Sequence, residues 1–288
     1  MSRPHIEWIQ AQVLPWEKDL HEDGRPGVER KILSRDDETG ASTLIIRYPA
    51  GWQFTEPCYL LSDEQMLVLS GELEINGTVY GPDCFAHLPK GYARFNASSS
   101  KGADVLTFLS GKFDLVKGSP PDGQFDLSSS IPYLDTGELA WDKGEAGHEK
   151  IDPNYSWLDM RVKELYYDGS TRTRISLLMT SAQNHPPEWR QQQEWHECYE
   201  ECLMISGDFI SNTGTWYGGA YFFRPPGILH GPFATRYGNL SVIRTIGLHE
   251  NNWTGSEFEL SMTPKHRPTL PPYLHQFAER PWVPSDRY

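Results

Sequence analysis

The sequence predicts an all-β protein made of two tandem copies of one unit. Residues 64–73 (EQMLVLSGEL) and 200–209 (EECLMISGDF) share one pattern at a spacing of 136 positions, from Glu64 to Glu200. Each is followed by Gly-Thr-x-Tyr-Gly, at 77–81 and 214–218, and then by Pro-x-Gly, at 89–91 and 225–227. Such self-similarity marks a repeated structural unit. Short apolar runs bounded by Gly, Pro, Asn and Asp recur at intervals of about ten residues, as is typical of an antiparallel sandwich or barrel.

The repeat also extends to the segments that lead into each copy. Residues 13–18 (VLPWEK) correspond to 138–143 (ELAWDK), and strand-like runs at 42–48 and 174–180 follow. A stretch near 117–137 is rich in Ser, Pro, Gly and Asp, which favours a linker. We therefore expect an N-terminal domain at 1–118, a linker at 119–137 and a C-terminal domain at 138–288. The proline-rich tail after residue 264 is expected to follow a surface rather than to continue a sheet.

Composition excludes several classes of function. The 288-residue chain has a formal net charge of −13, so a general nucleic-acid binder is not expected. It contains no apolar run of the roughly 20 residues that cross a membrane, and the N-terminus lacks the apolar core of a signal peptide. The four cysteines have no Cys-x-x-Cys spacing, which suits free thiols in a reducing cytosol. We expect a cytoplasmic protein that binds neither membrane nor nucleic acid.

The second copy carries residues that resemble the motifs of the cupin superfamily, a small jelly-roll barrel. Its second motif, G(x)5PxGxxH(x)3N, is matched at Gly219, Pro225, Gly227 and His230, although Ala234 replaces the final Asn. The first motif, G(x)5HxH(x)3–4E(x)6G, is matched in part.

In that first motif, His196, Glu200 and Gly207 are present, and Glu194 stands where the first histidine belongs. The resemblance extends over most of the chain and implies a bicupin, with two cupin domains in tandem. Its motifs are specific to the superfamily and not to one activity.

The first copy departs from the motifs at the metal-ligand positions. It keeps Glu64 and Gly71, but Cys58, Leu60 and Arg94 occupy the places of the three histidines. The resemblance therefore implies a structural copy that has lost its metal chemistry. Glu64 and Arg94 could form a buried ion pair there, or the site could be a small-molecule pocket.

Strand geometry independently brings the residues of the second copy together. Side chains two apart on a strand share a face, so Glu194, His196 and Glu200 point the same way, and a strand after the Pro-x-Gly turn can bring His230 to them. Two imidazoles and a carboxylate form an open-sided set for a divalent metal. Fe(II) is favoured, with Zn, Mn or Ni possible. Glu194 or His185 is expected as a fourth ligand or as a catalytic base.

Other interpretations of these residues remain open. His196 and Glu200 could be a hydrogen-bonded pair without metal. His-Glu-x-x-Glu also resembles the zinc-peptidase helix His-Glu-x-x-His, but the second His is absent and the sequence around it predicts a strand. Aromatic residues crowd the second motif. We expect a substrate pocket formed by Trp195, Tyr221, Phe223 and Arg224, in which the arginine could hold a carboxylate.

The resemblance implies a metal-dependent enzyme that acts on a small organic substrate, with aromatic compounds and carboxylates as candidates. The first reaction that it implies is that of a non-haem dioxygenase. One alternative is a lyase, isomerase or hydrolase in which the metal acts only as a Lewis acid. The other alternative is a non-catalytic protein that senses a small molecule, because a fold does not determine a function. Cupins often dimerise through sheet edges, so a homodimer is expected.

Overall fold

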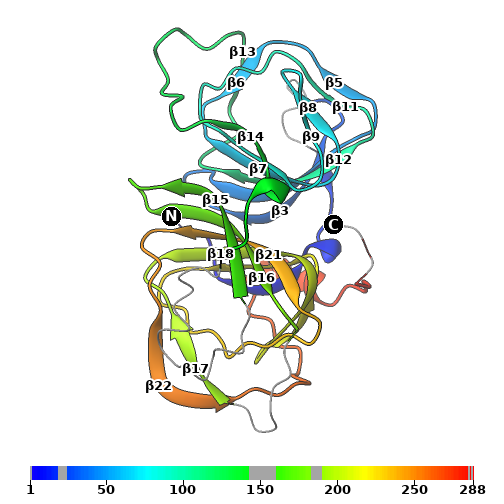
Figure 1. Cartoon of the computed structure of the whole chain (residues 1–288). Coiled ribbons are helices and arrows are strands. Elements are labelled where there is room, and N and C mark those ends of the chain that lie inside the picture. Colours follow the sequence, from blue (N-terminus) through cyan, green and yellow to red (C-terminus); the bar gives the residue numbers. More distant parts are fainter. Residues whose placement is uncertain (1, 19–24, 143–159, 183–189, 285, 287) are drawn as a thin grey trace. The chain divides into compact units, whose positions relative to one another are not determined.

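The computed structural model describes residues 2–18, 25–142, 160–182, 190–284, 286 and 288, and it divides into two compact units (Figure 1). The first unit comprises Met1–Arg3, Leu14–Leu139 and Tyr288. The second comprises Pro4–Val13 and Ala140–Arg287. Both are built almost entirely of antiparallel strands, as the sequence predicts. No helix of the described residues is long and apolar enough to cross a membrane.

The elements of the first unit are β2 (Glu17–Lys18), β3 (Glu29–Arg35), β4 (Ser42–Tyr48), β5 (Trp52–Phe54), β6 (Cys58–Leu60), β7 (Glu64–Gly71), β8 (Leu73–Ile75), β9 (Thr78–Tyr80), β10 (Cys84–Leu88), β11 (Ala97–Ser99), β12 (Ala103–Leu109), β13 (Leu115–Lys117), β14 (Ile131–Asp135) and the 3₁₀ turn η2 (Thr136–Glu138). Its main sheet has the order β14-β10-β7-β12-β4-β3-β2. A four-stranded sheet, β5-β11-β8-β9, and the pair β13-β6 complete the unit.

The elements of the second unit are β1 (Ile6–Gln10), the 3₁₀ turn η1 (Ala11–Val13), β15 (Met160–Asp168), β16 (Thr173–Thr180), β17 (Arg190–Trp195), β18 (Tyr199–Ser211), β19 (Gly214–Tyr217), β20 (Ala220–Arg224), β21 (Asn239–Ile246), β22 (Asn252–Glu259), the 3₁₀ turn η4 (Pro272–Leu274) and the helix α2 (His275–Ala278). Its main sheet has the order β1-β20-β18-β21-β16-β15, with β19 on β18, and β17 pairs with β22.

Two strands, β1 and β14, lie in a different unit from the one that their position in the sequence suggests. Strand β1 precedes the first copy of the repeat but belongs to the second unit, where it pairs with β20. Strand β14 lies in the stretch expected to be a linker but pairs with β10 in the first unit. The two units therefore differ from the expected domains 1–118 and 138–288 in two places: residues 4–13 belong to the second unit, and the stretch expected to be a linker belongs to the first. Each repeated Trp then serves its own unit: the Trp16 ring contacts Lys31, and the Trp141 ring contacts Lys163.

The repeated glycines at the end of the Glu-x6-Gly pattern are required by a close backbone approach. Gly71 ends β7 with φ +77°, and Gly207 on β18 has φ +84°. A Cβ on Gly71 would lie 1.9 Å from the carbonyl oxygen of Gly102, and one on Gly207 would lie 2.0 Å from that of Gly238. Both positions exclude any side chain and favour the conformation that glycine adopts at least cost.

The interiors of the two units differ in how fully they are packed. In the first unit, inward positions of β7 and β10 such as Met66, Val68 and Ala86 join one large apolar core. The cavity that remains there measures about 40 Å³. In the second unit the equivalent interior encloses a cavity of about 490 Å³. The same architecture is therefore closed in the first unit and hollow in the second.

Candidate metal centre

Five polar side chains converge at one end of the cavity in the second unit. Glu194 lies near the end of β17, His196 follows that strand, and Glu200 lies near the start of β18. His230 and His249 lie in the loops after β20 and β21. The backbones of Glu194 and His230 exchange two hydrogen bonds of 3.0 and 2.9 Å. These bonds fix both residues side by side.

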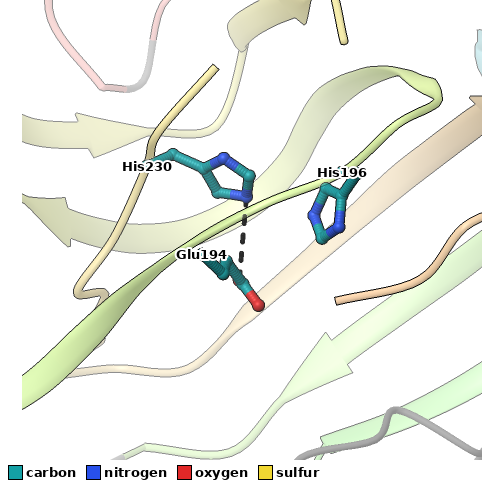
Figure 2. A group of neighbouring side chains, drawn as sticks. All are labelled: Glu194, His196 and His230. Atoms are coloured by element: carbon teal, nitrogen blue, oxygen red, sulfur yellow. Dashed lines mark ion pairs between the residues drawn. The ribbon is translucent and has the colours of Figure 1, made fainter. Parts of the chain in front are cut away.

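The ligand atoms of these side chains lie within a few ångströms of one another. Glu194, His196 and His230 form one group in which these atoms are within 4.8 Å, and His196, Glu200 and His249 form another. Figure 2 shows the first group, with an ion pair of 3.7 Å between His230 Nε2 and Glu194 Oε1. His230 Nε2 is 3.9 Å from Glu200 Oε2, and His196 Nε2 is 4.0 Å from the same oxygen.

Backbone carbonyl groups orient both buried imidazoles toward the cluster. His196 Nδ1 donates to the carbonyl oxygen of Glu250 at 3.0 Å, and His230 Nδ1 donates to that of Ile228 at 2.8 Å. A proton held on Nδ1 leaves Nε2 with a free lone pair, and Nε2 is the atom that faces the carboxylates. Metal-binding histidines are commonly oriented by such a hydrogen bond from their second nitrogen.

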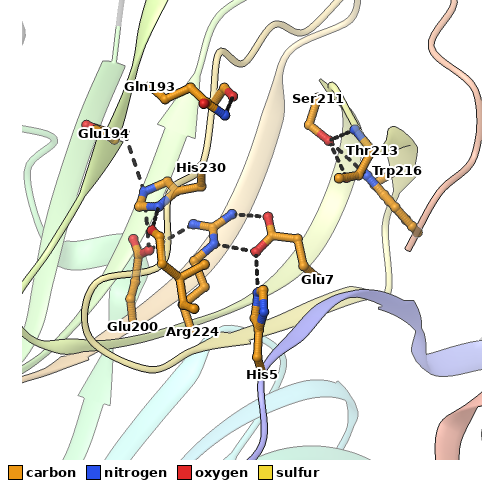
Figure 3. Close-up of polar contacts among 12 residues, drawn as sticks. His5, Glu7, Gln193, Glu194, Glu200, Ser211, Thr213, Trp216, Arg224 and His230 are labelled. Carbon is orange, nitrogen blue, oxygen red and sulfur yellow. Dashed lines mark hydrogen bonds and ion pairs between the residues drawn. The ribbon is translucent and has the colours of Figure 1, made fainter. Parts of the chain in front are cut away.

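A buried arginine connects the cluster to the N-terminal strand (Figure 3). Arg224 Nη1 donates to Glu200 Oε2 at 2.8 Å. Its Nε and Nη2 donate to the two oxygens of Glu7 at 2.6 and 2.5 Å, and His5 Nε2 lies 3.2 Å from Glu7. Glu7, Glu200 and Arg224 are each at least nine-tenths buried, so these charges depend on one another for compensation.

Burial and neighbouring charges separate the pKa values of the two acids in the cluster. Burial, reinforced by the charge of Glu200, raises the pKa of Glu194 to about 8. Burial also opposes ionisation of Glu200, but Arg224 and the neighbouring imidazoles outweigh it and lower its pKa to about 2. Burial and the Arg224 charge lower the pKa of His230 to about 3. At neutral pH His230 is thus a neutral imidazole, the form that binds metals.

The donor set fits a divalent metal ion. Metal–ligand bonds of about 2.0–2.2 Å place neighbouring donor atoms roughly 3–4 Å apart, which matches the separations in the cluster. Glu194 Oε2 is buried and has no hydrogen-bond partner among the described residues. A bound cation would favour the ionised form of Glu194; Glu7, Glu194 and Glu200 against Arg224 then carry two negative charges, which a divalent cation neutralises. The candidate ligands are His196, His230, Glu200, Glu194 and His249.

The cavity beside the cluster is lined mostly by apolar side chains. They include Leu178, Met204, Phe209, Phe222, Phe233 and Ile243. A volume of about 490 Å³ lies within the range of small-molecule sites. Asn239, Ser241 and Thr245 add polar groups that could orient a ligand.

Three residues expected in a substrate pocket do not line this cavity. Trp195 points away from the face shared by Glu194 and His196, because neighbouring residues on a strand alternate. Tyr221 and Phe223 lie on the opposite face of β20 from Phe222 and Arg224. The Tyr221 hydroxyl donates to Glu201 at 2.6 Å, and Phe223 packs against Tyr199.

Arg224 does line the cavity, but its role differs from the one expected. Two carboxylates of the chain itself, those of Glu7 and Glu200, engage its guanidinium. It is therefore not available as the expected clamp for a substrate carboxylate. His185, the other candidate for fourth ligand or base, lies outside the described residues.

Sequence reasoning missed two members of the site. His249 is exposed, and its ring centroid lies 4.3 Å from that of His196. No sequence motif marks it; its place follows from β21, which neighbours β18 in the sheet. Glu7 lies more than 180 positions before the cluster and carries no motif. It reaches the cluster only because β1 pairs with β20.

The first unit has an ion pair where the second has its cluster. Arg94 Nη2 lies 2.8 Å from Glu64 Oε2, and both side chains are about nine-tenths buried. This is the pair that the sequence suggests in place of a metal site. Both candidate metal groups found among the described residues lie in the second unit.

Comparison with known proteins decides the family. Residues 6–252 match the model of a domain of unknown function, DUF4437. The chain belongs to this family. No curated protein matches it.

Solved structures show the fold. A "putative dioxygenase" from Nostoc punctiforme PCC 73102 is similar with a TM-score of 0.69 and 16% identity, over 90% of this chain and 87% of that one. Vicilin from hazelnut, Corylus avellana, has a TM-score of 0.52 and 8% identity, over 88% and 87%. Oxalate decarboxylase from Bacillus subtilis has 0.51 and 10%, over 86% and 78%. The chain has the fold of these structures, two cupin-like β domains in tandem, as its motifs predict. At these identities the likeness concerns the fold alone.

Proposed function

We propose that this bicupin is a metal-dependent enzyme that acts on a small organic substrate in the cavity of its second unit, and that the reaction is a dioxygenation at a non-haem Fe(II). The observation that carries the proposal is the convergence of imidazole and carboxylate donors at the edge of a cavity of about 490 Å³. Sets of histidine and carboxylate ligands with open positions suit Fe(II) and its oxygen chemistry. The similarity to the Nostoc punctiforme protein supports the same class.

The residues of the chain have distinct parts in this proposal. His196, His230 and Glu200 hold the metal, and Glu194 or His249 provides a further ligand. The bound metal supplies open positions at which substrate and O₂ meet. The lining of Phe222, Phe233 and Met204 excludes water and orients an apolar or aromatic substrate. Arg224 keeps Glu200 ionised.

The cavity favours an uncharged, largely apolar substrate over a small dicarboxylate. Its buried cation, Arg224, is already bonded to Glu7 and Glu200. Arg174 at the rim pairs with Glu164 at 3.0 Å and is half exposed. Among the described lining residues, neither arginine therefore offers a free guanidinium deep in the cavity. A volume of this size would also leave a molecule as small as oxalate poorly packed.

A second candidate function follows from Glu194. Its pKa of about 8 allows a side-chain carboxyl to give or take a proton near neutral pH. With a metal that acts only as a Lewis acid, the same site would support a lyase, isomerase or hydrolase reaction.

The decisive experiment is metal analysis of untagged protein followed by oxygen uptake with Fe(II) and a panel of aromatic and keto acids and their uncharged analogues. Oxygen consumption coupled to loss of one substrate supports the dioxygenase. Turnover without oxygen consumption supports the Lewis-acid reaction. Protein that binds the panel compounds without turnover is a sensor, and protein that retains no divalent metal contradicts both enzymatic proposals.

A further inference from the structure

Among the described residues, the pair formed by Glu7 and Arg224 has no counterpart in the first unit. The strand pairings of the two units are in the same register, so equivalent residues can be read directly. In the second unit Ile6 faces Phe223, Glu7 faces Phe222 and Gln10 faces Ala220. In the first unit Ile131 faces His87 and Asp135 faces Cys84. At this register Pro132 takes the place of Glu7, and Leu88 takes the place of Arg224.

The first unit also shows what a lone buried arginine does near the ligand glutamate. Arg94 stands where His230 stands in the second unit, and it bonds directly to Glu64 at 2.8 Å. Glu64 is the equivalent of Glu200. The bond is to one carboxylate oxygen, and Arg94 Nη1 donates to the carbonyl oxygen of Tyr92 at 3.4 Å. A buried arginine near this position thus engages the ligand carboxylate directly.

In the second unit Glu7 accepts hydrogen bonds from two of the three nitrogens of the Arg224 guanidinium. Two of its donors, Nε and Nη2, bond to Glu7, and Nη1 bonds to a single oxygen of Glu200. Such parallel bonds to one carboxylate hold both position and orientation. The backbone of Glu7 is itself fixed by reciprocal hydrogen bonds of 2.7 and 2.6 Å with Thr269. Glu7 thus arrives on a rigid strand and holds Arg224 in one orientation.

We propose that Glu7 is a positioning residue of the metal centre: by binding Arg224 through two hydrogen bonds it limits this guanidinium to one bond with Glu200 and so keeps the Glu200 carboxylate available to a metal ion. The inference rests on the proposed metal site. Removal of Glu7 would free the Nε and Nη2 donors of Arg224, which could then turn to the second oxygen of Glu200.

The test compares Glu7→Gln, the double variant Glu7→Gln/Arg224→Met and a matched control, all in the full-length chain. The control is Glu201→Gln, which changes a buried acid bonded to Arg244 at 3.0 Å on the opposite face of β18. The probe is Co(II) alone, titrated to obtain the Kd while its visible absorption reports the ligands. Thermal unfolding of metal-free protein is followed in parallel.

We expect Glu7→Gln to weaken Co(II) binding by roughly 10–100-fold, the usual effect of a residue that orients a ligand. The double variant should bind Co(II) more tightly than Glu7→Gln, because no guanidinium then competes for Glu200. Glu201→Gln should lower the unfolding temperature and leave the Kd unchanged. If Glu7→Gln does not fold, Glu7→Asp replaces it, because it keeps the charge while its side chain, one methylene shorter, draws the carboxylate back from Arg224.

The outcomes separate the two proposals. If Glu7→Gln binds Co(II) as tightly as wild type and is only less stable, like Glu201→Gln, Glu7 is structural and the inference is wrong. The same conclusion follows if the double variant remains as weak as Glu7→Gln. If wild type itself binds no Co(II) at this site, the proposed metal function fails, and the positioning role fails with it.

Discussion

Glu64 and Arg94 form a buried ion pair at the positions that Glu200 and His230 occupy in the second unit, with 2.8 Å between Oε2 and Nη2. This pair accompanies the loss of the other two ligand positions, where Cys58 and Leu60 stand in place of Glu194 and His196. An arginine supplies a fixed positive charge, whereas a neutral histidine supplies a lone pair to a metal. The two units keep one architecture, but the first has an arginine cation where the second has side chains suited to a metal cation.

From this relationship we expect Arg94→Met to destabilise the protein by about 3–5 kcal/mol, because it leaves the Glu64 carboxylate buried without its partner. The double variant Glu64→Gln/Arg94→Met should recover most of the loss, since it removes both charges. Urea unfolding of the three proteins measures this. Equal losses in the single and double variants would show that packing, not charge, sets the cost.

The second prediction concerns metal stoichiometry. We expect one divalent metal per chain, because both candidate groups found among the described residues lie in the second unit. His230→Ala removes an imidazole shared by the contacts to Glu194 and Glu200, and metal content should fall close to zero. Elemental analysis after dialysis measures it. Two metals per chain, or one retained in His230→Ala, would contradict the prediction.

Much of this arrangement is predictable from the sequence, and the reason is its repetition. The spacing of 136 residues and the cupin motifs predict the paired sandwiches, and strand alternation brings Glu194, His196 and Glu200 to one face. The same alternation, applied strictly, would have excluded Tyr221 and Phe223, since Phe222 and Arg224 face the cavity.

What could not be predicted depends on contacts between segments distant in sequence. The pairing of β1 with β20 leaves no local pattern, so Glu7 could not be assigned to the site. His249 enters from a loop whose path no periodicity describes. The role of Arg224 likewise depends on Glu7. Without Glu7, two donors of the guanidinium would be available to a substrate carboxylate, as the sequence suggests.

The third prediction concerns acid stability in the first unit. Burial opposes ionisation of Asp36, but hydrogen bonds from the backbone amides of Thr39, Ser2 and Glu38 lower its pKa to about 2. A depressed pKa stabilises the fold at pH values above the unfolded value of 3.8, and this contribution is lost as the pH falls toward 2. Wild type should thus be more stable than Asp36→Asn at pH 6, with a gap that narrows by pH 3. Urea unfolding across that range measures it, and a constant gap would contradict the pKa shift.

The fourth prediction is that the protein is a homodimer in solution. Strand β15 pairs with β16 at the edge of its sheet, and it has nine residues, Met160–Asp168. Long edge strands are usually covered or paired. Light scattering at micromolar concentration should give twice the mass of the 32.9 kDa chain. A clean monomer would contradict the prediction.

The last prediction distinguishes the two roles open to Glu194. This residue replaces the first histidine of the cupin motif, its Oε1 lies 3.7 Å from His230 Nε2, and its Oε2 is buried without a hydrogen-bond partner. If Glu194 is a ligand, Glu194→Gln should lose most of its metal, because an amide oxygen is a weaker ligand than a carboxylate. If it is a base, metal content should remain near that of wild type and turnover should fall by roughly 10²–10⁴-fold. We favour the role of metal ligand, because a bound cation would compensate the buried Glu194 Oε2, which has no hydrogen-bond partner among the described residues. Elemental analysis beside the rate with the substrate found in the oxygen-uptake panel separates the two. A variant unchanged in both would exclude both roles and leave His249, which contacts His196, as the better candidate for the remaining position.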